Sequence, residues 1–315
     1  MGKNKNLIFN SILLLVICLS MLILGYWDAK QVGVSFFEEK VHTVIIDEEA
    51  DIKAMGASFH NNICYLDKDI TITDSSVLSS SELPFVGEFD GQGHTITFEY
   101  EPQNSLFGYI GKNGVVKNLN VVVKSVTFDN KKGGILAIEN KGQILDCTVT
   151  LESAKITVKG NYGGAVVNNR GLIKNVIVNT HFENAMSEDV MANHARLTMG
   201  GICAYNHKDG GEINSCIVQT TFANFNETDE EKIFTGQALN SSIGSVYGIN
   251  NGGIVERTDV IISDKVYVAD CRDQKLTFKS SAAEVYTDEN LFINLGFNDK
   301  KWELVLEDFG LIQGE

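Results

Sequence analysis

The stretch Gly133–Val149, GGILAIENKGQILDCTV, is followed by two close copies of itself. The second copy begins at Gly163 and reads GGAVVNNRGLIKNVIV, and the third begins at Gly200 and reads GGICAYNHKDGGEINSCIV. Each copy contains a pair of glycines, an asparagine, a further glycine and a spaced row of apolar residues. Self-similarity of this kind is typical of proteins built by stacking one supersecondary unit many times.

The repeats align on the glycine that follows the asparagine, and five segments share this alignment. These segments begin at Gly114, Gly142, Gly171, Gly211 and Gly253. The column two places after the glycine contains Val116, Ile144, Ile173, Ile213 and Val255. The column five places after it contains Leu119, Cys147, Val176, Cys216 and Thr258. The column seven places after it contains Val121, Val149, Val178, Val218 and Val260, so all three columns are mostly apolar. The column four places later is mostly short and polar, and it reads Asn118, Asp146, Asn175, Ser215, Arg257.

This column pattern predicts the fold. The spacing from the fifth to the seventh place is a strand alternation, whereas the step from the second to the fifth changes the phase and requires a bend. Asn and Asp suit that bend because they tolerate left-handed backbone. One unit cannot bury its apolar face alone, but stacked units can. The sequence therefore predicts an all-β, right-handed parallel β-helix.

The ends of the chain predict a cap at each end of the β-helix, and a membrane segment and a stalk before it. Residues 47–58 have an acidic first turn and spaced apolar residues, which predicts a short N-terminal capping helix. The expected organisation is a signal-anchor segment at 1–27, a stalk or first strand at 28–46, the β-helix with its N-terminal cap at 47–275, and a C-terminal cap at 276–315.

The N-terminal segment Leu7–Tyr26 holds about twenty mostly apolar residues without a charge, enough for a helix to cross a bilayer. Lys3 and Lys5 precede it, so its N-terminus is expected to stay in the cytoplasm and the rest to be exported. We expect a single-pass protein of the cell membrane that contacts the lipid bilayer through this helix. The alternative is secretion after signal cleavage, although GYWDAK offers no clean A-x-A site.

Composition narrows the class of partner. The net charge is −15 and no run of Lys and Arg occurs, which argues against a nucleic-acid partner.

Cys147 and Cys216 share a column but are separated by the repeat that carries Val176, so they should lie roughly 9–10 Å apart. That distance is too long for a disulfide, and we expect both to be small buried core residues.

The repeat GGILAIENKGQILDCTV resembles the GLUG repeat of bacterial surface proteins. The upstream segments CYLDKDITIT and LPFVGEFDGQGHTITFEY, and the C-terminal FINLGFNDKKWEL, resemble other parts of the same proteins, so the resemblance covers about residues 45–305. Ala137 and Val167 stand where the family repeat has its fifth-position Gly, and the segment at Gly253 lacks the Asn. The resemblance implies a right-handed β-helix on a cell surface, as in adhesin-like proteins, and it implies no particular activity.

Two insertions interrupt the repeats, at residues 183–199 and 224–243, and both fall at the same repeat phase. Insertions at one phase emerge on one side of a solenoid, where binding surfaces often lie. The candidate binding surface comprises Glu188, Asp189, His194, Arg196, Asn226, Asp229, Glu230 and Lys232. A glycan or a surface protein is the expected ligand. The competing interpretation is that both insertions are merely tolerated surface loops.

An enzyme is the second hypothesis, because a carbohydrate-active lyase or glycoside hydrolase of pectate-lyase-like fold would use this architecture. Glycosidases need two facing carboxylates, whereas Glu139, Glu212 and Glu256 fall at different repeat phases. Asp90 and His94, in FDGQGH, resemble an acid–base pair but fit a structural turn better. The sequence therefore favours a protein without a catalytic centre, cofactor or metal.

The three histidines of the middle region do not match a metal-binding pattern. His181, His194 and His207 have spacings that fit no compact metal motif. We expect these side chains to be exposed to solvent.

Overall fold

The computed structural model describes residues 41–55, 60–73, 83–99, 105–187, 189–190, 195–223, 241–261 and 269–270. Tertiary contacts divide the chain into one unit of Met1–His42 and a second of Thr43–Glu315. The predicted membrane segment and the predicted C-terminal cap lie outside the described residues. Among the residues that are described, no helix is long and apolar enough to span a membrane.

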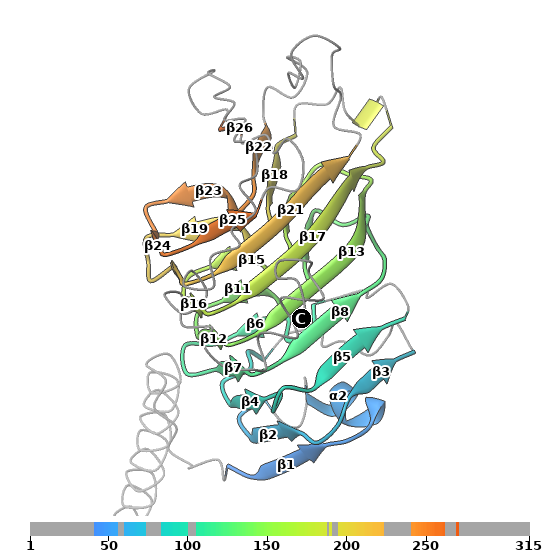
Figure 1. Ribbon diagram of the computed structural model, residues 1–315, viewed down its shortest axis with the longest axis vertical. Coiled ribbons are helices and arrows are strands. Elements are labelled where there is room, and N and C mark those ends of the chain that lie inside the picture. The colour runs from blue at the N-terminus through green and yellow to red at the C-terminus, as the bar shows by residue number, and fades with distance from the viewer. Residues whose placement is uncertain are drawn as a thin grey trace, which may run out of the picture. The chain divides into compact units, whose positions relative to one another are not determined.

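The described residues of the second unit form mostly strands, which are arranged in four sheets (Figure 1). Sheet A contains β1 (Thr43–Ile46), β2 (Ile63–Leu66), β4 (Glu88–Asp90), β7 (Val115–Lys117), β12 (Gln143–Leu145), β16 (Leu172–Lys174), β20 (Glu212–Asn214) and β24 (Ile254–Glu256). Sheet B contains β3 (Ile70–Ile72), β5 (Thr95–Phe98), β8 (Asn120–Val123), β9 (Val126–Phe128), β13 (Thr148–Ile156), β17 (Ile177–Asn184), β21 (Ile217–Ala223) and β25 (Asp259–Ile261).

The other two sheets are narrower. Sheet C contains β6 (Tyr109–Ile110), β11 (Ala137–Asn140), β15 (Val166–Asn169), β19 (Cys203–His207) and β23 (Tyr247–Asn251). Sheet D contains β10 (Lys132–Gly134), β14 (Asn161–Gly163), β18 (Leu197–Gly200), β22 (Ser241–Gly244) and β26 (Ala269–Asp270). Within these sheets every strand pairing is parallel except β22 with β26.

From β7 to β25 the chain visits the sheets in the fixed order A, B, D, C, and then returns to A. Each strand pairs with the equivalent strand of the preceding repeat. Val149, for example, pairs with Val121 on one side and with Val178 on the other, and Val178 pairs with Val218. The predicted all-β class with parallel sheets is therefore confirmed, and so is the predicted register of the repeats.

The apolar columns predicted from the sequence form the core. Val149, Ile144 and Cys147 are all completely buried, as are their counterparts in the neighbouring repeats. Burying one Val or Ile side chain contributes about 1.5–3 kcal/mol, so the columns together supply much of the stabilising free energy. Because each column spans several repeats, the core is one continuous cluster from Ile46 to Ile243.

The polar column forms the corner between sheets A and B. Asn118, Asp146 and Asn175 have φ angles of 51°, 52° and 53°, which is left-handed backbone. Ser215 and Arg257 share this conformation, with φ angles of 54° and 46°. Gln92, at 50°, is left-handed at the same corner one repeat earlier, where four residues join β4 to β5 in place of the two that join β7 to β8. The bend predicted between the two strands of each repeat is thus confirmed.

The paired glycines lie at the corner between sheets D and C. A Cβ atom on Gly163 would overlap the carbonyl oxygen of Val166, and one on Gly200 would overlap that of Cys203. In each repeat the obstructing group lies three residues further along the chain. Glycine is therefore required here by the close approach of the backbone to itself, a requirement that recurs at the same phase.

One short helix precedes the repeats. Helix α2 (Glu49–Met55) begins with acidic residues, and the Asp51 carboxylate accepts hydrogen bonds of 3.2 Å from the backbone N–H groups of Asp47 and Glu48. Ile52 is 3% exposed and belongs to the core. The helix predicted in this segment is present, and the contact of Ile52 is the one expected of a cap.

Candidate functional site

The two insertions leave and re-enter the sheets at neighbouring positions. The first connects β17 to β18 and the second connects β21 to β22, so both run from sheet B to sheet D. Glu183 pairs with Ala223 at the ends of β17 and β21, and Leu197 pairs with Ser241 at the starts of β18 and β22. The points of attachment are therefore adjacent, as expected for insertions at one repeat phase.

The structure describes two of the eight candidate binding residues. Asp189 is exposed, and the Arg196 guanidinium Nη2 donates a hydrogen bond of 2.9 Å to the Ser242 hydroxyl. This bond joins the end of the first insertion to β22. Glu188, His194, Asn226, Asp229, Glu230 and Lys232 lie outside the described residues. The insertion surface thus stays a prediction, supported by where its flanking strands lie.

Asp90 and His94 do not form an acid–base pair with each other. Asp90 Oδ1 accepts hydrogen bonds from the Gln92 backbone N–H at 2.9 Å and from Asn118 Nδ2 at 3.0 Å. His94 Nδ1 instead lies 3.2 Å from Asp69 Oδ1. The Asp90 carboxylate therefore holds the turn that precedes β5, as the structural interpretation of FDGQGH predicts.

The histidines of the middle region are separated in space. His181 lies on β17 in sheet B, with Nδ1 2.6 Å from Thr221 Oγ1, whereas His207 lies on β19 in sheet C. Both are half-buried, so the expectation that they are exposed is wrong for these two. The cause is their place inside strands, where neighbouring repeats cover part of each ring. His194 is outside the described residues.

The buried cysteines behave as core residues. Cys64, Cys147, Cys203 and Cys216 are completely buried, which confirms the prediction of buried core residues for the two that share a column. Burial raises the pKa of the Cys64 and Cys216 thiols to about 12, and it raises that of Cys203 further. These thiols are therefore protonated and unreactive at neutral pH. The described part of the chain contains no group of three or more His, Cys, Asp or Glu that could hold a metal ion.

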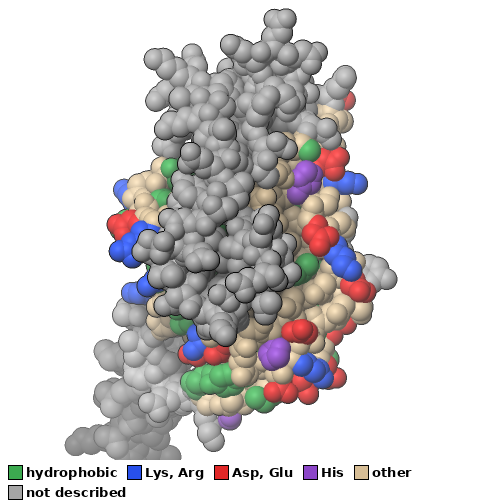
Figure 2. Space-filling model, in the orientation of Figure 1, with side chains coloured by type: hydrophobic (Ala, Val, Ile, Leu, Met, Phe, Trp, Pro, Cys, Tyr) green, Lys and Arg blue, Asp and Glu red, His purple; other side chains and the backbone are tan. Residues whose placement is uncertain are grey.

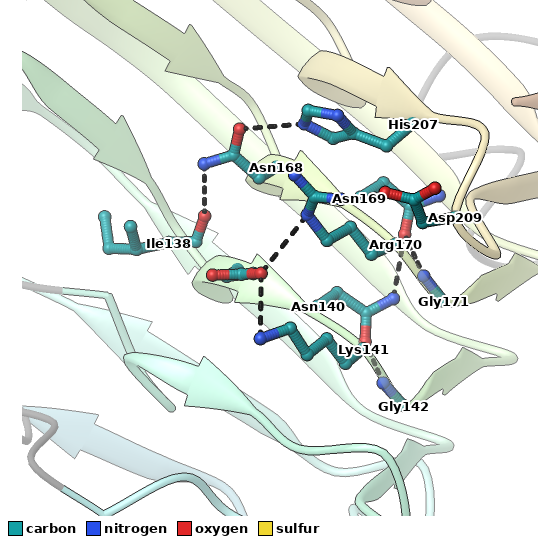
Figure 3. Close-up of polar contacts among 11 residues, drawn as sticks. Ile138, Asn140, Lys141, Gly142, Asn168, Asn169, Arg170, Gly171, His207 and Asp209 are labelled. Carbon is teal, nitrogen blue, oxygen red and sulfur yellow. Dashed lines mark hydrogen bonds and ion pairs between the residues drawn. The ribbon is translucent and has the colours of Figure 1, made fainter. Parts of the chain in front are cut away.

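A ladder of buried asparagines lines the corner between sheets C and A (Figure 3). Asn140 Nδ2 donates to Asn169 Oδ1 at 2.9 Å, and Asn169 Nδ2 donates to Asn206 Oδ1 at 3.0 Å. The Asn140 and Asn169 side-chain oxygens also accept from the N–H groups of Gly142 and Gly171. The three side chains are completely buried, and their amides satisfy backbone groups that the corner would otherwise leave unpaired.

A charged and polar cluster covers the outer side of this ladder. We call it the sheet C cluster, and it comprises Glu139, Lys141, Asn168, Arg170, His207 and Asp209 (Figure 3). Arg170 joins it together: Nε lies 3.4 Å from Glu139 Oε1, and Nη1 lies 2.8 Å from Asp209 Oδ2. Lys141 Nζ lies 3.2 Å from the same Glu139 oxygen. The cluster thus links three successive repeats.

His207 connects the cluster to the aromatic side chain beside it. Its Nε2 lies 3.2 Å from Asn168 Oδ1, and its ring stacks on that of Tyr205 with centroids 5.8 Å apart. Burial, followed by the Arg170 charge, lowers the pKa of His207, although Asp209 and Glu139 act in the opposite direction. The imidazole is therefore neutral at pH 7 and can donate or accept a hydrogen bond. The cluster offers hydrogen-bonding groups and an aromatic face.

The sequence reasoning missed this cluster, although a signal for it exists. The residues on either side of the ladder asparagine read ENK, NNR and YNH in the three repeats. Residues one place before and one place after a buried strand residue share the opposite, outer face. Polar and aromatic side chains at both places therefore mark a surface. The recurring columns do not reveal these outer residues, because their types differ between repeats.

Basic and acidic side chains are mixed on the rest of the described surface. On the face drawn in Figure 2, the described basic side chains lie among acidic ones. In sheet A, Lys117 is paired in this way, since its Nζ lies 2.7 Å from Glu88 Oε1 and 3.6 Å from Asp90 Oδ2. Phosphate binding requires unpaired positive charge, so this mixture does not favour it.

Comparison with known proteins gives no relative from which a function could be taken. No protein-family model, no curated protein sequence and no solved structure matches the chain. The function is therefore inferred from the register of the repeats, the placement of the insertions and the side chains described above.

Proposed function

We propose that the chain is a right-handed parallel β-helix, tethered to the cell membrane by residues 7–26, that presents a binding surface outside the cell. The fixed order of sheets A, B, D and C and the parallel register between repeats support the β-helix. The right-handed crossover of nearly all parallel β units supports its hand. The uncharged N-terminal segment and the resemblance to GLUG-repeat surface proteins support the location.

One observation carries the binding role: the two long insertions attach to adjacent strands. The equivalent connection one repeat earlier, between β13 and β14, needs only residues 157–160. The insertions lengthen this connection in two successive repeats and so concentrate additional chain at one edge of sheets B and D. This edge, with the candidate residues from Glu188 to Lys232, is where a glycan or surface-protein ligand would bind.

The enzymatic alternative lacks a comparable observation. A glycosidase needs two carboxylates with a sugar between them. Glu139 and Asp209, the acidic residues of the sheet C cluster, instead bind the same Arg170 guanidinium. Glu88 and Asp90 likewise share Lys117. These pairings stabilise the surface and leave neither pair free to act on a glycosidic bond.

The test is made on whole cells that express the full-length chain with a C-terminal tag. We expect the tag to be accessible to antibody and to added protease on intact cells, and the expressing cells to adhere to a matrix or to partner cells. Residues 186–195 and 224–240 are then each replaced by a four-residue connection copied from 157–160. Replacing both should abolish adhesion without removing the protein from the surface.

Two results would overturn the proposal. A tag that becomes accessible only after the cells are lysed would contradict the location and orientation. Adhesion that persists at full strength after both replacements would contradict the insertion surface. Lys174→Ala, an exposed change on sheet A in the same repeats, serves as the control and should leave adhesion unchanged.

A further inference from the structure

The outer face of sheet C carries a file of partly exposed side chains from four successive repeats, and the next residue in register, Ile249, is buried. Tyr109 pairs with Glu139, Glu139 with Asn168, and Asn168 with Tyr205, all in parallel register. Each of the four is half-buried, and the Glu139 side chain is 21% exposed. Neighbouring strands lie about 4.8 Å apart, so the file presents a side chain at that interval across four repeats.

A second file runs beside the first, two residues later in the chain, within β19 or directly after β11 and β15. It contains Lys141, Arg170 and His207, and its members contact the first file through Glu139 and Asn168. His207 and Tyr205 share the outer face of β19, and the ion pairs of Lys141 and Arg170 with Glu139 bring these two side chains to the same surface. Figure 3 shows these side chains gathered over β11, β15 and β19. The surface lies on a different sheet from the insertions.

The groups on this surface are the ones that recognise sugars. Planar carboxylate, amide and guanidinium groups can each bond two neighbouring hydroxyls, because they present pairs of acceptors or donors in a fixed plane. An aromatic ring packs against the C–H face of a sugar while its polar edge stays hydrated. The first file alternates these types, with a tyrosine at each end and a carboxylate and an amide between them.

The surface is also held in place before any ligand arrives. The Tyr205 hydroxyl lies 3.2 Å from Thr198 Oγ1 and 3.4 Å from Asn161 Oδ1, and its ring stacks on His207. Arg170 is fixed between Glu139 and Asp209. Side chains already ordered in this way lose little conformational entropy on binding, which favours affinity.

Charge selects among the possible glycans. Glu139 and Asp209 carry two negative charges, and Lys141 and Arg170 carry two positive charges already paired with them. The cluster is therefore neutral, and the whole chain has a net charge of −15. An anionic polymer would be repelled by the chain and would have to displace Glu139 or Asp209 from Arg170. An uncharged glycan is not repelled and leaves both ion pairs of Arg170 intact.

We propose that the outer face of sheet C binds an uncharged, extended polysaccharide that runs across the strands, with successive sugars over successive repeats. The sugar unit of an extended chain is about as long as the ~4.8 Å strand spacing, so tyrosine, carboxylate and amide would meet consecutive units. The face is distinct from the insertion surface, and the inference depends on the proposed function only for the extracellular location that lets a glycan reach it.

The experiment measures binding of defined hexasaccharides to the purified full-length chain by isothermal titration calorimetry. The chain is kept in a detergent without a sugar head group, so that the detergent cannot compete. The probes are cellohexaose and chitohexaose, which are uncharged and extended, and hexagalacturonate, which is anionic. We expect at least one uncharged probe to bind and the anionic probe to bind at least ten-fold more weakly.

Variants then locate the site. Tyr205→Ala and Asn168→Ala should each weaken binding of the uncharged probe, by roughly five- to ten-fold, through loss of stacking or of paired hydrogen bonds. Tyr205→Phe keeps the ring and should bind within about two-fold of wild type. Asn179→Ala is the matched control, because Asn179 is half-buried on sheet B in the same repeat as Asn168. It should bind as wild type does.

Several outcomes would overturn the inference. The first is that neither uncharged probe binds, and the second is that hexagalacturonate binds more tightly than the uncharged probes. The third is that Asn179→Ala and Asn168→Ala lose affinity for the uncharged probe equally. In each case the tag accessibility and the insertion-dependent adhesion could still hold, so the proposed function would stand. If adhesion depended on Tyr205 but survived removal of glycans from the partner surface, the face would belong to a protein ligand, which also contradicts the inference.

Discussion

Two corners of each repeat solve the same problem in different ways. Between sheets C and A, the chain turns around a buried side chain, and Asn140, Asn169 and Asn206 form one ladder through three repeats. Between sheets A and B, it turns by adopting left-handed backbone at a single residue. The first corner requires a particular side chain, whereas the second requires a particular φ angle.

This difference explains which residues recur. The ladder position is asparagine in each of the three connected repeats, because the amide must both donate to the next repeat and accept from a backbone N–H. The left-handed corner accepts several residue types, and these are Gln92, Asn118, Asp146, Asn175, Ser215 and Arg257. Substitutions should therefore cost more at the ladder than at the left-handed corner.

The largest effect is expected at the middle of the ladder. Asn169→Ala removes the acceptor of Asn140 and the donor to Asn206 and to the Glu212 carbonyl, and it leaves the Gly171 N–H without its partner. Buried groups left unsatisfied in this way should lower the free energy of unfolding by about 2–4 kcal/mol, measured by chemical denaturation followed by circular dichroism. Asn168→Ala, on the outer face, is the control. Equal losses in the two variants would contradict the ladder's role.

A smaller loss is expected at the left-handed corner. Asn175→Ala removes the hydrogen bond from Nδ2 to Asp146 Oδ1. It also places alanine, which tolerates left-handed backbone less well than asparagine, at a φ of 53°. It should lower the free energy of unfolding by about 1–2 kcal/mol. Asn175→Gly relieves the backbone strain and should cost less than Asn175→Ala. If glycine proves as costly as alanine, the hydrogen bond, and not the backbone conformation, determines the corner.

The same corner offers a stabilising change. Arg257 has a φ of 46° and an exposed side chain, so its replacement loses little packing. Asparagine tolerates left-handed backbone better than arginine, so Arg257→Asn should raise the midpoint of denaturation by the equivalent of about 0.5–1 kcal/mol. Arg257→Ala, which cannot gain in this way, should give no increase. A gain in both variants would point to the removed charge as the cause.

The smallest effect is expected for the pH dependence of stability that arises from His207, on the outer side of the asparagine ladder. The folded-state pKa of His207 lies below its usual value, first through burial and then through Arg170. The unfolded chain therefore binds a proton more readily, and the contribution to stability is present above the usual imidazole pKa of about 6.5 and is lost as the pH falls through the folded-state pKa.

Arg170→Gln tests this cause directly. Removal of the guanidinium charge should move the pKa of His207 upward toward its usual value, as followed by NMR titration of the imidazole. The loss of stability on acidification should shrink accordingly. A pKa that falls in Arg170→Gln would show that the Arg170 charge does not lower it.

Much of the fold could be predicted from sequence because the core columns recur. Val121, Val149, Val178 and Val218 pair in register as their common place in the repeat predicts. The left-handed corner was predictable from its polar column, although Gln92 was missed since the corner between β4 and β5 is two residues longer than the later ones.

The candidate site was harder to predict, because surface chemistry follows no period. Glu139, Arg170 and His207 differ in type at related phases, so only the folded register brings them together. The burial of His181 and His207 was missed for a similar reason, since it depends on strands of neighbouring repeats and not on local sequence. The insertion residues from Asn226 to Lys232 lie outside the described residues.

The most direct test of the central claim, that equivalent residues of successive repeats stack in register, is a pair of engineered disulfides on the outer face of sheet B. Thr150 pairs with Asn179, and Asn179 with Gln219. One strand spacing is about 4.8 Å, within reach of a disulfide, whereas two spacings are about 9.6 Å and out of reach. Under mild oxidation, Thr150→Cys with Asn179→Cys should cross-link, and Thr150→Cys with Gln219→Cys should not, as read by mass spectrometry. Cross-linking of the second pair and not the first would contradict the stacked register.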